Sequence, residues 1–162
     1  MNKAHSIDHR AHEAIRSPCL FPLILVGLFA MLGAVDATPA GSIEGSSNKI
    51  RSRVTDLSQF SNSLRGPDQE IALDLGHMGE RTLRLLDHIK DLLLIESLIQ
   101  SEADKRKIGP IIDSRAKGLA HDIDADVKMI NTAMTYAHNR ALIDTASKLK
   151  DDLREVQELL LR

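Results

Sequence analysis

The sequence predicts an all-α protein, an antiparallel up-down bundle of three to four helices that follows an N-terminal signal peptide. Apolar residues after residue 48 recur at steps of three and four, which is the period of an amphipathic helix. Glycine–proline pairs at 66–67 and 109–110 mark helix boundaries. Aromatic residues make up only 2% of the chain, so the core must be aliphatic.

Residues 1–37 have the layout of a signal peptide. A segment with three basic residues precedes an apolar block of about 17 residues, at the short edge of what spans a bilayer. Small residues at Val35 and Ala37 suit a signal peptidase, and we predict cleavage after Ala37 with export to the extracellular space or periplasm. The alternative is an uncleaved signal anchor, which would make the chain a single-pass membrane protein.

The exported part is expected to fold without disulfides. The single cysteine, Cys19, lies inside the leader, so the mature chain would contain no thiol. Residues 38–47 are rich in Pro, Gly and Ser and predict a flexible tether. The helical bundle domain is expected over residues 48–162, which is long enough to bury a core.

Two helices are expected before residue 102. The first is indicated by an apolar stripe and ends at Gly66; the stripe is Ile50, Val54, Leu57 and Leu64. The second begins at Pro67 with acidic residues over the positive end of the helix dipole, and is expected to continue to about Ser101. Its inward face is predicted to contain Ile71, Leu75, Met78, Leu85, Ile89, Leu92 and Leu93.

The second helix also has a nearly opposite apolar face, formed by Leu83, Leu94 and Leu98. These three leucines are the candidate partner surface. In the alternative interpretation, another helix of the same chain buries them.

A polar loop is expected over residues 102–109, followed by a third helix from Pro110. Its stripe runs from Ile112 to Ala141, and a second stripe from Leu142 onward is rotated by about 100°. This change of phase predicts a joint near residues 138–140, with Asn139 suited to a left-handed cap. Two helices and one bent helix both remain open.

The segment His121–Asp126 (HDIDAD) has the residue types of a metal site, but helical geometry sends its side chains to different flanks. We therefore expect a solvated helix face. His77 and His88 are eleven residues apart, about 16 Å along a helix, which is too far for one metal. Gly76 and Gly79 indicate a kink or a close backbone crossing within the second helix.

No motif for catalysis stands out, since a nucleophile elbow, a phosphate-binding glycine loop and a paired acid and base are all missing from the sequence. We expect a non-enzymatic protein with no catalytic residues, no cofactor and no bound metal. The net charge of −2 gives no broad positive field, so a nucleic-acid partner is not expected.

One four-residue segment, Arg81-Thr82-Leu83-Arg84, resembles the Arg-x-Leu-Arg host-entry motif of secreted oomycete effectors, and it lies downstream of the predicted signal peptide as in that family. The resemblance implies an effector-like secreted protein.

The favoured prediction of function is a secreted, non-enzymatic helical module that binds a protein partner or itself through its surface. Besides the effector-like alternative, the aliphatic bundle could bind a lipid or an apolar surface. Contact with a membrane is expected only if the leader remains uncleaved.

Overall fold

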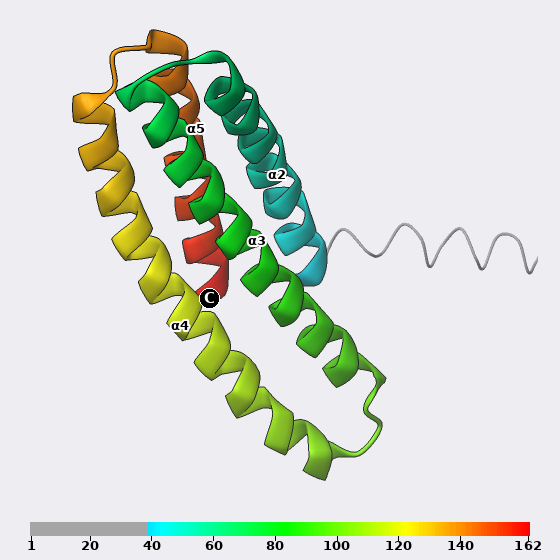
Figure 1. Ribbon diagram of the computed structural model, residues 1–162. Helices are drawn as coiled ribbons and strands as arrows, with labels where there is room; N and C mark the ends of the chain where they lie inside the picture. The colour runs from blue at the N-terminus through cyan, green and yellow to red at the C-terminus, as the bar shows by residue number, and fades with distance from the viewer. Residues whose placement is uncertain (1–38) are drawn as a thin grey trace, which may run out of the picture. The chain divides into compact units, whose positions relative to one another are not determined.

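The structure is a computed structural model that describes residues 39–162, and these residues form four helices (Figure 1). They are α2 (Pro39–Ser63), α3 (Pro67–Leu98), α4 (Glu102–Tyr136) and α5 (Arg140–Leu160). No strand occurs in this part of the chain, so the prediction of an all-α protein is confirmed. The predicted signal peptide and its cleavage site lie outside the described residues.

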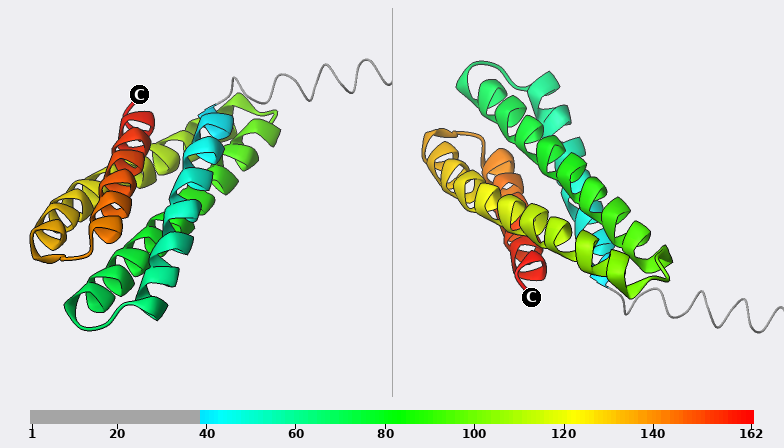
Figure 2. Two further views of the ribbon diagram at one scale, coloured as in Figure 1. Left: turned by 90° about the horizontal axis from the view of Figure 1, so that it is seen from above. Right: turned by 90° about the horizontal axis from the view of Figure 1, so that it is seen from below.

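The four helices form a ring in which each packs against two neighbours. Helix α2 packs against α3 and α5, and α4 packs against the same two helices, whereas α3 and α5 touch only slightly. Figure 2 shows the bundle from above and from below. Loops of three residues separate successive helices, so the end of each helix lies beside the start of the next.

The core follows the alternating three- and four-residue steps of a heptad pattern, in which every seventh residue faces the same neighbours. Helix α2 contributes Ile43, Ile50 and Leu57, all buried. The same spacing gives the buried residues Leu75, Leu86 and Ile89 in α3, Leu119, Ile123 and Ile130 in α4, and Leu142, Ala146, Leu149, Leu153 and Val156 in α5. The aliphatic core expected from the composition is therefore present.

The flexible tether predicted for residues 38–47 is wrong from residue 39 onward, because these residues form the first turns of α2. Ile43, Ser46 and Ser47 are buried against the other helices. Glycine and serine are poor helix formers in isolation, but tertiary packing commonly outweighs such propensities. A Ser/Gly-rich composition indicates a linker only when nothing packs against it.

Ion pairs also hold the start of α2. Glu44 pairs with Lys90 of α3, and Lys49 pairs with Glu155 of α5 at 2.6 Å. The hydrogen bond from Lys90 holds the pKa of Glu44 below its ordinary value of 4.5. An ionised Glu44 therefore stabilises the fold above that ordinary value, and the contribution is lost as the pH falls through the lowered pKa of the folded state.

Replacing Glu44 with glutamine should lower the free energy of unfolding at pH 7 by less than about 1 kcal/mol, because the pair is only partly buried and water screens its charges. At pH 3 the difference between the two proteins should shrink, since Glu44 is then protonated in the unfolded chain and increasingly so in the folded one. Urea denaturation at both pH values measures this. An equal difference at pH 7 and pH 3 would contradict the role of the charge.

Two boundaries differ from the prediction. Helix α3 ends at Leu98, slightly before the expected Ser101, and the loop predicted at 102–109 is wrong because α4 already begins at Glu102. Acidic residues in its first turn favour the helix dipole, and ion pairs within one turn join Lys105 to Glu102 at 3.2 Å and Lys107 to Asp104 at 2.8 Å. Pro110 is accommodated inside the helix.

The predicted joint near residues 138–140 is confirmed, and the chain forms two helices there rather than one bent helix. Asn139 does not adopt the left-handed conformation that was expected, because its φ is −80°. It caps the start of α5 instead, and its side-chain oxygen accepts a hydrogen bond from the backbone N–H of Leu142 at 3.0 Å.

Candidate functional site

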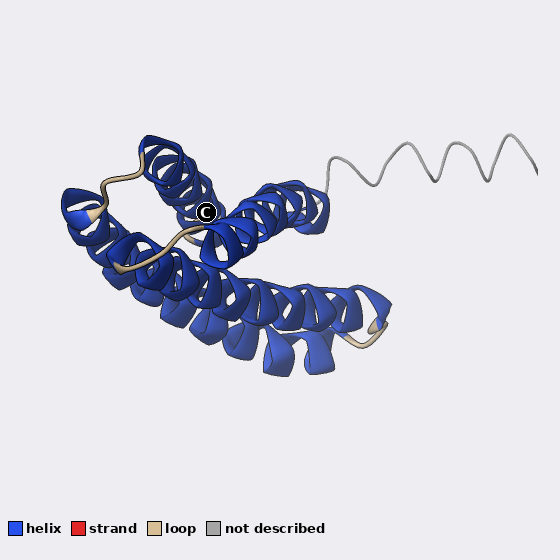
Figure 3. Cartoon of the chain, turned by 45° about the horizontal axis from the view of Figure 1, so that its top comes forward, coloured by secondary structure: helices blue, strands red, loops and turns tan. Residues whose placement is uncertain are grey.

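The end of α3 and the start of α4, which one loop connects, extend beyond the start of α2 and the end of α5 (Figures 1 and 3). The Glu44–Lys90 ion pair joins the start of α2 to α3, and the side-chain amide of Gln157 in α5 donates to the carbonyl of Ala120 in α4 at 2.9 Å. We refer to residues 91–112 as the hairpin end. Leu93 and Ile112 are still covered at its base, whereas toward the connecting loop α3 and α4 run beyond the two other helices (Figure 1).

The hairpin end exposes large aliphatic residues. Leu94 is 59% exposed and Leu98 is 72% exposed, and Ile95 and Ile111 are also about half exposed. Leu98 follows Ile95 by three residues and Leu94 by four, so the three side chains share one side of α3. A cluster of this kind on a projecting element is typical of an interaction surface.

The three leucines of the candidate partner surface therefore fall into two groups. Leu83 is only 8% exposed and belongs to the core, so its assignment to an exposed surface is wrong. Leu94 and Leu98 are exposed and belong to the C-terminal end of α3, where this helix and α4 run beyond the two other helices (Figure 1). Leu85, which was expected on the inward face, is instead exposed.

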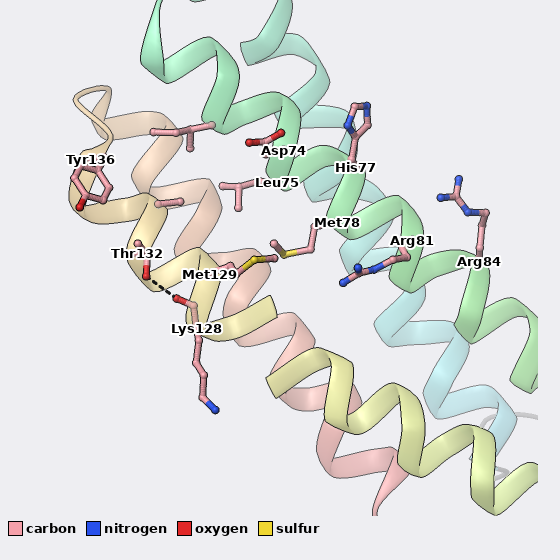
Figure 4. A pocket seen from close by; sticks show the side chains of 12 residues that line it. Asp74, Leu75, His77, Met78, Arg81, Arg84, Lys128, Met129, Thr132 and Tyr136 are labelled. Carbon is pink, nitrogen blue, oxygen red and sulfur yellow. Dashed lines mark hydrogen bonds between the residues drawn. The ribbon is translucent and has the colours of Figure 1, made fainter. Parts of the chain in front are cut away.

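A groove of about 750 Å³ lies between α3 and α4, within the four-helix part (Figure 4). Apolar residues from both helices contribute to it, with the thioethers of Met78 and Met129 facing each other. Its polar side chains are mostly basic and include Arg81, Arg84 and Lys128. The complete lining is Ile71, Asp74, Leu75, His77, Met78, Arg81, Arg84, Lys128, Met129, Thr132, Ala133 and Tyr136.

Arg81, which lines one side of the groove, forms an ion pair with the buried Asp126. The guanidinium of Arg81 donates to Oδ1 of Asp126 at 2.5 Å, and the Asp126 side chain is only 1% exposed. Its second oxygen, Oδ2, has no hydrogen-bond partner. The expectation that the whole of His121–Asp126 forms a solvated helix face is therefore wrong for Asp126.

The other members of this segment lie differently. His121 and Asp122 are exposed, as expected. Asp124 accepts a hydrogen bond from Lys128 at 2.6 Å, and this bond lowers the pKa of Asp124. Within residues 39–162, no group of three or more histidine, cysteine or acidic side chains is arranged to hold a metal ion.

The Arg81–Arg84 segment lies in the middle of α3 and is not an exposed linear motif. Thr82 and Leu83 are buried, and Arg81 is engaged with Asp126. Arg84 lies beside the groove and has no ion pair with any residue that the structure describes.

The two histidines of α3 are not brought together. His77 lines the groove, whereas His88 lines a separate hollow of about 210 Å³ further along the α3–α4 seam. Gly79 lies at a close approach of α2, because a Cβ atom there would be 2.5 Å from Cγ2 of Val54. This confirms the backbone crossing that the glycines predicted, at Gly79 and not at Gly76, where the nearest atom would be 3.9 Å away.

Comparisons with known proteins found no matching protein family, curated protein or solved structure. None of the helices between residues 39 and 162 has both the length and the apolar character to cross a membrane.

Proposed function

We propose that this chain is a secreted, non-enzymatic helical protein that acts as a protein-binding module through its hairpin end. The observation that carries the proposal is the exposure of Leu94 and Leu98 at the C-terminal end of α3, a helix that runs together with α4 beyond the two other helices (Figure 1). We also infer an antiparallel up-down order for the four helices, which the three-residue loops and the ring of neighbours support.

Burial of these leucines supplies the driving force for association. Covering a leucine side chain fully contributes about 1.5–3 kcal/mol, so two leucines contribute enough to decide whether a weak complex forms. Charged residues also belong to the hairpin end, among them Glu96, Lys105 and Arg106. This arrangement of an apolar centre and a polar rim is typical of protein interfaces.

A second copy of the chain is the simplest partner, because a twofold axis lets the same surface cover itself on both molecules. We expect the mass of the protein in solution, measured by light scattering, to rise with concentration. The variant Leu94→Glu/Leu98→Glu should weaken this association by at least about tenfold, since two charges would have to be buried.

Leu73→Glu is a matched control, because Leu73 is also an exposed leucine of α3 but lies in the four-helix part. It should leave the association unchanged. Circular dichroism should show all three proteins equally helical. A wild-type protein that is monomeric at every concentration would exclude self-association, and unfolding of the double variant would show that its leucines belong to the core.

The N-terminal sequence of protein purified from the medium of a secreting host tests the predicted cleavage after Ala37.

A further inference from the structure

We infer that the groove between α3 and α4 binds a free long-chain fatty acid, with the carboxylate at Arg84 and the hydrocarbon chain along the two methionines toward Tyr136. This site is separate from the hairpin end and does not depend on the proposed protein-binding function.

The size and lining of the groove suit an aliphatic chain. Its volume of about 750 Å³ lies within the range typical of small-molecule sites, about 300–1,000 Å³. Met78 and Met129 have flexible, polarisable side chains that adapt to an irregular apolar ligand. Met129 is 52% exposed and Tyr136 is 67% exposed, so a bound chain would cover apolar surface that water now contacts.

The charges along the groove give the ligand a direction. Arg84 has no ion pair within residues 39–162, whereas the ammonium of Lys128 is held by Asp124 at 2.6 Å and points away from the two methionines (Figure 4). Arg81 is already neutralised by Asp126, which leaves the available positive charge at this end of the groove with Arg84. Asp74 precedes Arg84 by ten residues on α3, about 15 Å along the axis, and repels an anion from the opposite end.

The same geometry favours a single aliphatic chain over an acidic peptide helix. A helix with its side chains is about 10 Å wide and is recognised through anchors on several successive turns. The groove is confined to one stretch of a seam between two helices that are already packed together. A chain with one charged end and a long apolar body fits both its volume and its charge distribution.

Tyr136 provides a direct test, because it is the only tyrosine and the sequence has no tryptophan. The full chain is titrated with a dibrominated C18 fatty acid below its critical micelle concentration, and the quenching of tyrosine fluorescence is followed. We expect saturable quenching at one ligand per chain. Arg84→Gln should weaken binding by about tenfold, since one charge-assisted hydrogen bond is lost.

Met129→Glu should abolish binding, whereas Arg106→Gln, an exposed arginine on the hairpin end, should not change it. The methyl ester of the same fatty acid should bind more weakly than the acid. Every protein contains the same leader residues, so differences between variants report the groove alone. Leu94→Glu/Leu98→Glu should keep wild-type affinity, which separates this site from the hairpin end.

Three results would overturn the inference: equal affinity for the acid and its ester, no effect of Arg84→Gln, or quenching that requires micelles or anionic vesicles. The last would indicate binding to a lipid surface and not to a free fatty acid. Because Arg84 is exposed and unpaired, its variant should fold even if Met129→Glu does not, which circular dichroism verifies.

Discussion

Replacing Arg81 with methionine should lower the free energy of unfolding by about 2–3 kcal/mol. Within residues 39–162, Arg81 is the one cation paired with Asp126, whose side chain is 1% exposed. Removing one partner of a buried ion pair typically costs about 3–5 kcal/mol because the remaining charge is left without compensation. The lower figure is expected here because the Arg81 side chain is half exposed, so water already weakens the pair. Urea denaturation followed by circular dichroism measures the loss.

A second substitution distinguishes a lost charge pair from lost packing. Adding Asp126→Leu to Arg81→Met should recover most of the stability, because the buried charge is then removed as well. Arg84→Met is the matched control, since Arg84 is an exposed arginine of the same helix without an ion pair, and it should change stability by less than about 0.5 kcal/mol. A double variant as unstable as Arg81→Met would show that Asp126 is not the cause.

The position of Asp126 suggests why a charge is kept in the core. It lies between Ile123 and Ile130 in the heptad pattern of α4, so a carboxylate occupies a core position whose neighbours along the helix are aliphatic. Sliding α4 along α3 by one turn would break the Arg81–Asp126 pair of the observed alignment.

Periodicity was sufficient to predict the central part of each helix because each has an apolar stripe that faces the core. The phase change after Ala141 correctly predicted the joint between α4 and α5. Composition misled at residues 39–47, where small residues serve close packing, and at 102–109, where charged residues begin a helix. In the first segment the deciding contacts are with distant helices, whereas the ion pairs in the second are local i,i+3 pairs whose helical spacing the charge pattern already contains.

The candidate surfaces were less predictable for a related reason. A helical wheel assigns one environment to each face along its whole length, but α3 has several neighbours around Leu83 and only one near Leu98. The groove depends on the register of two helices about fifty residues apart in sequence, because Met78 and Met129 meet only after α3 and α4 are aligned. No local pattern encodes that alignment.

Two glycines of α3 should respond in opposite ways to the same substitution. Gly79→Ala should lower the free energy of unfolding by about 1–2 kcal/mol, because the added methyl would lie 2.5 Å from Cγ2 of Val54 and overpacking costs more than the gain in helix propensity. Gly76→Ala should instead raise it by up to about 1 kcal/mol, since its methyl would meet Leu57 only at 3.9 Å. Urea denaturation of both variants gives the comparison directly.

Val54 offers a test of the cause. In the Gly79→Ala background, Val54→Ala removes the methyl groups that clash, so the double variant should be at least as stable as Gly79→Ala alone. In the wild-type background, the same Val54→Ala change should destabilise the protein, because Val54 packs against the core. This reversal of sign is expected only if α2 and α3 touch at Gly79. If Val54→Ala is equally harmful in both backgrounds, the close approach of the two helices is not what requires a glycine there.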